Sequence, residues 1–506
     1  MNRIRAVRLL TASCVAAIAA TSAAVVNTGV ADASGPTVTG AGSTWVQIAL
    51  DQWRADIAHQ GYSINYQGVG SSAGREFYII NQVDFAATEI PFQPDEVRQL
   101  QGEHKSYQYL PDVAGGTSLM YNLHNAAGSR ITSLRMDATT AAKIFTGSIT
   151  SWQDPAIQAL NPGLAIREST VIPVVRSDGS GTSAQFSLYL ADQAASVWNA
   201  FVSAQGCPAP CSIWPTFNGS TQQSGSDGVA NFVSNDAVGG GAIGYVEAGY
   251  AFGRGFPVAS LHNASGNFTQ PTSNSVAIAL THATLNADLT QNLTAVYRAP
   301  DPTAYPMSSY SYMVTPTANF DPAKGFVLGT WLIYIACGGQ REAAPLGYSP
   351  LPPNLVAAVF GAVKRIPGAP TPPPIDAAHC PNPTITGEST AQAGTKSGSS
   401  SHSGTSGASA TASAASAAAA AAAAASAGST AAATGVSGVS AASGTAAATL
   451  GDAQRQQLFL LAEQAALAAK APSGVPLLAS GLGILLVVFV PALLGWRRGS
   501  RQRRMK

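Results

Sequence analysis

The sequence predicts an α/β fold with two lobes, and three observations support this prediction. Short apolar strands alternate with helical patterns from about residue 37 to residue 367, which is typical of largely parallel sheets flanked by helices. The folded region, residues 34–383, is too long for a single core of this kind, so we expect two lobes. Three loops rich in glycine and hydroxyl residues each follow a strand and open a helix, where open α/β sheets bind their ligands.

The strands and helices are expected from the alternation of apolar and polar residues and from the turns between them. The segment YSINYQ, for example, alternates as a half-buried strand does. The expected elements are, in chain order, a strand at 37–39, a helix at 45–59, a strand at 62–67, a helix at 72–81, strands at 83–87 and 171–175, a helix from Ser183 and a strand at 241–246.

Composition and the N-terminus indicate an exported protein. Only 10% of the residues are charged, against roughly 25% in a typical globular protein. Lys and Arg number 27 and Asp and Glu 26, with no basic patch before the last ten residues, so we expect no nucleic-acid partner. Basic residues, an apolar run at 9–26 and the small residues of Ala31-Asp32-Ala33 predict a signal peptide over residues 1–33 rather than a first transmembrane helix.

The C-terminal quarter predicts a membrane anchor. Residues 384–453 are almost entirely Ala, Ser, Gly and Thr, which cannot build a core, so we expect a disordered stalk. A short juxtamembrane helix is expected at 454–470. Residues 477–496 carry no charge and as a helix would span about 30 Å, one bilayer core. The basic residues of 497–506 then lie in the cytoplasm, and the binding domain lies outside the cell.

Removal of the signal peptide leaves four cysteines, Cys207, Cys211, Cys337 and Cys380. An even number outside the cell favours disulfides. The first two are spaced for a local loop, and the last two would then tie the end of the domain back to its body. The alternative, a four-cysteine metal site, fits this spacing poorly and has no histidine nearby.

The three loops are GAGSTW (40–45), GVGSSAG (68–74) and RSDGSGT (176–182). Glycine allows backbone amides to converge on an oxyanion, and Ser and Thr add further donors. Arg176 offers a fork that can hold two oxygens, and Asp178 could orient it. Each loop alone could be only a turn and a helix cap, but three of one chemical type are more specific.

Two catalytic motifs were weighed against this interpretation. Gly68, Gly70 and Ala73, with Glu89 further on, mimic a dinucleotide fingerprint, but no nicotinamide cofactor is expected outside the cell. Residues 70–74 match G-x-S-x-G, yet no downstream Asp and His have the context of a hydrolase. The seven histidines are scattered, which argues against zinc. We therefore expect no enzyme activity, cofactor or metal.

The loops and their flanks, in this order, resemble the substrate-binding protein of the high-affinity phosphate ABC transporter. The resemblance runs from about residue 37 to residue 363. The matching segments are GAGSTW (40–45), NYQGVGSSAG (65–74), VDFAATEIP (83–91), FTGSITSWQDPAIQALNPG (145–163), VVRSDGSGTS (174–183), GAIGYVE (241–247) and YSPLPPNLV (348–356). This resemblance implies a type II periplasmic-binding fold with lobe I at 37–114 and 308–367, lobe II at 115–307, and crossing strands near 115–120 and 308–313.

The resemblance also implies a ligand set. The phosphate-binding groups would be Thr44, the backbone amide of Trp45, Ser71, Arg176, Ser180, Gly181 and Thr182, with Asp178 paired to Arg176. Glu89 stands where the family usually has Asp, and Trp45 where it usually has Phe. A carboxylate at position 89 can accept a hydrogen bond from a phosphate proton and repel sulfate, which carries no proton.

The resemblance implies inorganic phosphate as ligand and ABC permease subunits as partners. A self-contained core predicts that the binding domain is monomeric. Acidic residues outnumber basic ones between residues 34 and 383, so binding must rest on local hydrogen bonds rather than on long-range attraction. The alternative function is a surface-anchored oxyanion sensor or adhesin without a permease.

Overall fold

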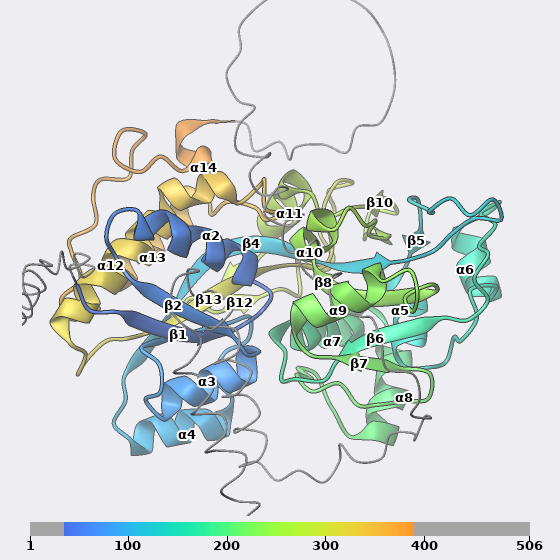
Figure 1. Ribbon diagram of the computed structural model, residues 1–506, viewed down its shortest axis with the longest axis horizontal. Coiled ribbons are helices and arrows are strands. Elements are labelled where there is room, and N and C mark those ends of the chain that lie inside the picture. The colour runs from blue at the N-terminus through green and yellow to red at the C-terminus, as the bar shows by residue number, and fades with distance from the viewer. Residues whose placement is uncertain (1–34, 389–506) are drawn as a thin grey trace, which may run out of the picture. The chain divides into compact units, whose positions relative to one another are not determined.

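The structure is a computed structural model that describes residues 35–388, all within one compact unit (Figure 1). The predicted signal peptide, nearly all of the stalk, the juxtamembrane helix, the transmembrane helix and the basic tail lie outside the described residues. Within residues 35–388, no helix combines the length and the apolar character that crossing a bilayer requires.

One eight-stranded sheet runs through both lobes, in the order β2-β1-β3-β13-β4-β8-β6-β7. Its strands are β1 (Val38–Gly42), β2 (Ile64–Gly68), β3 (Phe85–Thr88), β4 (Tyr107–Tyr121), β6 (Ile172–Arg176), β7 (Thr221–Gln223), β8 (Ala242–Glu247) and β13 (Ser308–Pro316). The strands β2, β1 and β3 are parallel in lobe I, and β8, β6 and β7 are parallel in lobe II.

The long strand β4 connects the two lobes. Its first part pairs antiparallel with β13 in lobe I, and residues Thr117–Tyr121 pair antiparallel with β8 in lobe II. β13 also pairs with β3. The predicted crossing segments at 115–120 and 308–313 thus fall within two strands that are hydrogen-bonded to each other.

Helices and small sheets surround the two halves of the large sheet, as Figure 1 shows. Lobe I carries α2 (Gln47–Ala58), α3 (Ser71–Ile79), α4 (Pro94–Gly102), α12 (Pro322–Ala336), the 3-10 helix η2 (Gly338–Glu342) and α13 (Pro353–Val363). The segment between β4 and β13 carries α5 (Ala138–Phe145), α6 (Pro155–Leu160), α7 (Gly181–Gln193), α8 (Ala195–Gln205), α9 (Gly225–Ser234), α10 (Ala248–Gly253) and α11 (Ser273–Leu280). The short strands are β5 (Arg135–Met136), β9 (Ser260–His262), β10 (Phe268–Thr269), β11 (Thr284–Leu285) and β12 (Gln291–Asn292).

The two-lobed α/β prediction is confirmed, and each of the eight expected elements is present within a few residues of its predicted position. The clearest shift is in the first loop, because residues 40–42 continue β1 instead of leaving the sheet. A side chain at Gly40 would lie 2.0 Å from the Phe85 ring. Glycine at this position therefore serves close packing between strands, and the sequence alone suggested a loop.

Both disulfides form with the expected partners, Cys207 with Cys211 and Cys337 with Cys380. The second joins the end of α12 to the C-terminal segment. There the side-chain amide of Asn382, just before α14 (Pro383–Thr386), donates to the carbonyls of Ala336 and Leu351. The end of the domain is thus fixed to lobe I.

Candidate functional site

The three predicted loops meet between the lobes. The first two lie at the C-terminal ends of β1 and β2 in lobe I, and the third follows β6 in lobe II. The side chains of Thr44, Trp45, Ser71, Glu89, Arg176, Ser180 and Thr182 are all buried, with no more than 5% of any residue exposed. The fold therefore brings the predicted residues into one enclosed polar site.

Arg176 and Asp178 form a buried pair at the end of β6. The Arg176 Nε donates to Asp178 Oδ1 at 2.7 Å, and Nη2 donates to Oδ2. Burial raises the pKa of Asp178, but the Arg176 contact and the amide of Gly225 outweigh it and hold this pKa below its usual value. Asp178 thus occupies the Nε/Nη2 edge of the guanidinium, and the Nη1/Nη2 edge keeps N–H donors that can hold two anion oxygens. Nη1 lies 3.5 Å from Thr182 Oγ1 and 3.4 Å from Ser226 Oγ.

Glu89 follows β3 and lies at the centre of a group of hydroxyls. Ser43 and Ser311 donate to its Oε1, the latter at 3.2 Å, and Ser71 donates to its Oε2 at 2.9 Å. Burial raises the pKa of Glu89, while the three hydroxyls and the charge of Arg176 lower it, and the net effect is an increase. Glu89 is therefore a buried acceptor that hydroxyl donors partly stabilise in its charged form.

The first loop reaches across to lobe II. Thr44 Oγ1 lies 3.0 Å from Ser226 Oγ and accepts from the Ser226 amide at 3.0 Å. The Trp45 amide donates to Ser43 Oγ at 2.9 Å, and its indole Nε1 donates to Thr117 Oγ1 at 3.2 Å. The Trp45 side chain thus anchors the loop to β4, while its amide remains inside the site.

The third loop leads directly into α7, whose N-terminus faces the site. Ser180 is the N-cap, and its hydroxyl accepts from the Ser183 amide at 3.1 Å. The Gly181 amide donates to Ser71 Oγ at 3.1 Å. The unpaired amides of a helix N-terminus carry partial positive charge, so this end of α7 favours a bound anion.

The lobes are closed on each other in this structure. Besides the Ser71 to Gly181 contact, the Ser72 amide donates to the Gly179 carbonyl at 3.0 Å, and Gln185 Nε2 donates to the Glu89 carbonyl at 2.7 Å. Since the site residues are buried, an anion can reach them only when these contacts open.

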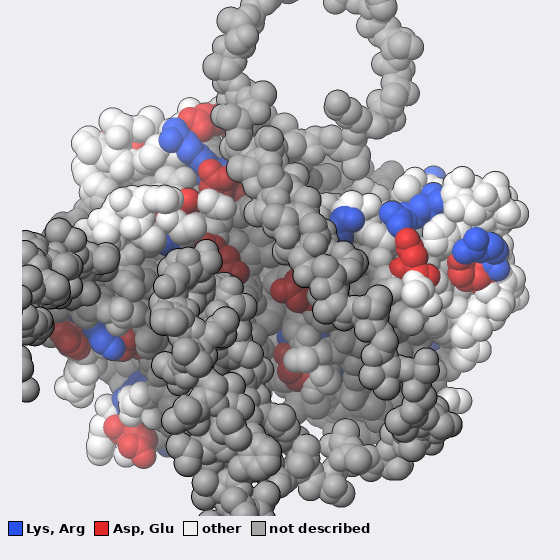
Figure 2. Space-filling view, in the orientation of Figure 1, with Lys and Arg blue, Asp and Glu red and all other residues white. Residues whose placement is uncertain are grey.

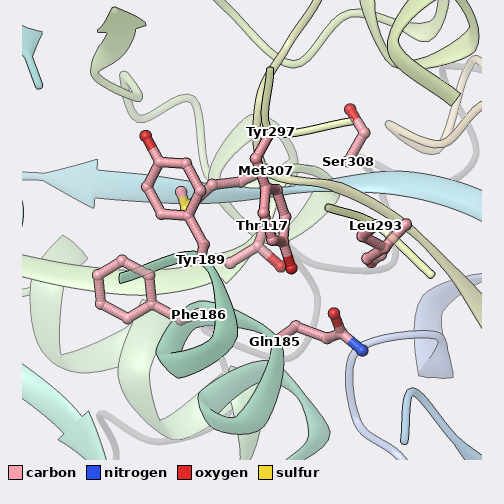
Figure 3. A pocket seen from close by; sticks show the side chains of 9 residues that line it. Thr117, Gln185, Phe186, Tyr189, Leu293, Tyr297, Met307 and Ser308 are labelled. Carbon is pink, nitrogen blue, oxygen red and sulfur yellow. The ribbon is translucent and has the colours of Figure 1, made fainter. Parts of the chain in front are cut away.

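A small cavity beside the site is shown in Figure 3, between α7 and the crossing strands. It is lined by Thr117, Gln185, Phe186, Tyr189, Leu293, Tyr297, Met307, Ser308 and Ser309. Its volume of about 10 Å³ accommodates roughly one water molecule, which is too small for a tetrahedral oxyanion. None of its lining residues belongs to the predicted phosphate-binding set.

Three site residues were not predicted from the sequence: Ser43, Ser226 and Ser311. Ser43 adjoins Thr44 in the first of the three predicted loops. Ser226 follows Gly225 at the start of α9, in a fourth glycine- and serine-rich turn after a strand, so the same signal could have found it. Ser311 lies within β13, where no loop pattern marks it.

Comparison with known proteins agrees with this geometry. A model of the PBP superfamily domain matches residues 19–332. The chain is 32% identical over 320 residues to the phosphate-binding protein PstS of Xylella fastidiosa, covering 63% of this chain and 82% of the relative. It is 30% identical over 321 residues to the PstS of Pasteurella multocida, covering 63% and 88%. The chain belongs to the PstS family of the PBP superfamily.

Solved structures support the same fold for this PstS-family member. The ancestral soluble variant of the human phosphate binding protein matches with a TM-score of 0.52 and 16% identity, covering 66% of this chain and 99% of that one. A high-affinity periplasmic phosphate-binding protein bound with phosphate matches with a TM-score of 0.51 and 15% identity, covering 64% and 93%. At this identity, the likeness shows the fold alone.

Proposed function

We propose that this protein binds inorganic phosphate outside the cytoplasm, between its two lobes, and delivers it to the permease subunits of an ABC transporter. Membership of the PstS family supports this function, and it supports a binding protein rather than an enzyme. The relatives named above are phosphate-binding proteins, so the alternative of an oxyanion sensor without a permease is not favoured.

The observation that carries the proposal is the buried carboxylate of Glu89, which lies among many donors. A carboxylate has about four acceptor positions, and three serine hydroxyls occupy three of those on Glu89. The position that remains suits the proton of HPO4²⁻ or H2PO4⁻. Sulfate has no proton at neutral pH, so it would meet this carboxylate as like charge against like charge.

The donors in the proposed complex come from both lobes. They are Thr44, the Trp45 amide and Ser71 from lobe I, and Arg176, Ser180, Gly181 and Thr182 from lobe II. The Ser71 hydroxyl and the Trp45 and Gly181 amides would exchange their present acceptors for the anion. In our proposal Arg176 contributes its Nη1/Nη2 edge, because Asp178 holds the Nε/Nη2 edge. Closure of the lobes would exclude water and strengthen each of these hydrogen bonds.

Affinity is expected from these short-range contacts rather than from the field of the protein. On the face drawn in Figure 2, the visible described Lys and Arg side chains are interspersed with Asp and Glu. A surface of mixed sign with an acidic excess does not attract phosphate from a distance.

Competition binding with sulfate tests the proposed role of Glu89. The wild type should bind phosphate unchanged in millimolar sulfate. Glu89→Gln should bind phosphate more weakly and discriminate less, because its amide can donate to sulfate. The control is Glu76→Gln, an exposed glutamate in α3, which should behave as the wild type. A wild type that binds sulfate as well as phosphate would contradict the proposal.

We also propose that residues 477–496 anchor the domain to the membrane, with residues 384–453 as a stalk and 497–506 in the cytoplasm. Attachment of residues 380–386 to lobe I would then leave lobe II free to move during opening. A chain that ends before residue 477 should appear in the culture medium, whereas the full chain should remain with the membrane. Equal release of both would refute the anchor.

A further inference from the structure

A second buried acid, Asp112, lies close to the anion site. It occupies a bulge in β4: Ser311 pairs with Val113 and Tyr312 pairs with Pro111, so Asp112 has no partner on β13. A bulge of this kind re-aims the extra side chain and is common beside binding sites. Asp112 is only 1% exposed, and neither of its carboxyl oxygens has a hydrogen-bond partner among the described residues.

The groups that face Asp112 do not compensate a negative charge. They are Glu89 after β3, Tyr66 on β2, Tyr312 on β13 and Tyr348 before α13. Burial, and next the charge of Glu89, raise the pKa of Asp112 well above its ordinary value. The nearby Ser311 hydroxyl and two backbone amides lower this pKa only in part.

Two neighbouring buried carboxyls do not both ionise readily, so one of them keeps a proton. Glu89 has three hydroxyl donors and the charge of Arg176 to stabilise a negative charge. Asp112 has neither an ion pair nor a direct hydrogen bond to its carboxyl among the described residues. The proton therefore belongs to Asp112 and the negative charge to Glu89.

We propose that Asp112 is a neutral carboxylic acid that turns to donate to the neighbouring Ser311 Oγ when the anion binds, a contact that is not made in the closed structure. Ser311 then donates to Glu89 and holds Glu89 as the carboxylate that accepts a hydrogen bond from the anion's proton. This inference rests on the proposed function of the site. Ser311 connects the two acids because its Oγ lies 3.2 Å from Glu89 Oε1 while it neighbours the bulge. Each hydrogen bond in such a chain polarises the next, so Asp112 acts on the anion only through Ser311 and Glu89. It is a positioning residue.

The ionisation of Asp112 should make phosphate affinity depend on pH. When Asp112 loses its proton, Ser311 loses a donor and a second negative charge lies beside Glu89. Both changes oppose the binding of an anion. Phosphate affinity should therefore fall as pH rises through the range in which Asp112 ionises, in addition to any change that phosphate itself undergoes.

The test compares phosphate affinity of the full chain across pH for the wild type and Asp112→Asn. The amide can still donate to Ser311 but cannot ionise, so the two affinities should agree within a few-fold at low pH. Above the pH range in which Asp112 ionises, the phosphate affinity of the wild type should fall relative to that of Asp112→Asn by up to about tenfold per pH unit, which is the slope for one proton. Taking the ratio at each pH cancels the titration of phosphate. Asp112→Thr, which keeps a hydroxyl donor, serves if the Asn variant does not fold.

The matched control is Glu247→Gln, because Glu247 is also fully buried and its Oε1 also has no partner among the described residues. The phosphate affinity of Glu247→Gln should change with pH as the wild-type affinity does. A constant ratio between wild type and Asp112→Asn at all pH values would overturn the proposal, as would a Glu247→Gln curve that matches Asp112→Asn.

Infrared spectroscopy of the phosphate-free protein provides a readout that does not depend on binding. The wild type should show protonated carboxyl bands from both Asp112 and Glu247 at neutral pH, and Asp112→Asn and Glu247→Gln should each lose a different one of them. Identical bands in the wild type and Asp112→Asn would overturn the role of Asp112. A wild type that binds no phosphate but shows the Asp112 band would instead refute the proposed function of the site.

Discussion

Gly181, the first residue of α7, permits the closest approach between the lobes at the site. A methyl group at this position would lie 1.9 Å from Glu89 Oε2 and 2.6 Å from Ser71 Oγ, both of which belong to lobe I. Contacts below 3.0 Å are essentially never observed for such a carbon, so Gly181→Ala requires a displacement of about 1 Å. Glu89 cannot easily move aside, because three hydroxyls hold its carboxylate. The lobes must therefore separate.

The cost follows from the contacts that this separation breaks. The Gly181 to Ser71 hydrogen bond, now 3.1 Å, would exceed hydrogen-bonding distance. Overpacking costs about 1–3 kcal/mol, and each lost hydrogen bond about 1 kcal/mol more. A total of roughly 2–4 kcal/mol, borne by the closed form alone, corresponds to about 30- to 1,000-fold weaker phosphate binding.

Calorimetric titration with phosphate measures this loss, and small-angle X-ray scattering with and without phosphate measures closure. Gly181→Ala should also fail to compact fully when phosphate is added. The control is Gly361→Ala in α13, where an added methyl group meets nothing within 4 Å and the affinity should not change. An unchanged affinity for Gly181→Ala would refute the inference that Gly181 and Glu89 approach each other in the bound state.

Three further predictions follow from individual contacts. Thr182→Ala should weaken phosphate binding by only about 1 kcal/mol in calorimetry, because it removes one neutral donor; a loss as large as that of a charged group would contradict this role. Replacing Cys337 and Cys380 by Ser should lower the free energy of unfolding by about 4 kcal/mol, and replacing Cys207 and Cys211 by about 2 kcal/mol, since the loops close over 43 and 4 residues. Equal losses in denaturant unfolding, or a larger loss for the Cys207–Cys211 pair, would contradict loop entropy as the cause. Burial holds the pKa of Glu247 well above its ordinary value, so the free energy of unfolding of the wild type should fall as pH rises above that ordinary value. Relative to the wild type, the free energy of unfolding of Glu247→Gln should rise by up to about 1.4 kcal/mol per pH unit. A pH-independent difference between their urea unfolding curves would contradict this assignment.

The loops of the site could be predicted because their signal is local. Gly70, Ser71 and Ser180 through Thr182 combine glycine, a hydroxyl and a helix start within a few residues, and each does open a helix in the structure. The resemblance of these segments to a known family added their order and their common ligand. Glu89 was identified by its position after a strand, and it does meet the Ser71 loop.

The remainder of the site depends on pairing between distant strands. Ser311 reaches Glu89 from β13, 222 residues further along the chain, and Asp112 faces the site only because β4 bulges opposite Tyr312. Neither residue lies in a turn or at a helix start. The pairing of Asp178 with Arg176 was predicted, but the edge of the guanidinium that Asp178 takes was not, since it depends on the three-dimensional form of the turn between the two residues.

Calorimetric titration of phosphate into the wild type, Arg176→Ala and Arg167→Ala tests the central claim most directly. Arg176 is 1% exposed within the site, whereas the Arg167 side chain is 54% exposed on the same lobe. We predict one phosphate bound per wild-type chain, no change for Arg167→Ala and at least about 30-fold weaker binding for Arg176→Ala, the cost of losing a buried charged partner. Phosphate binding that survives unchanged in Arg176→Ala would show that the anion does not bind between these loops.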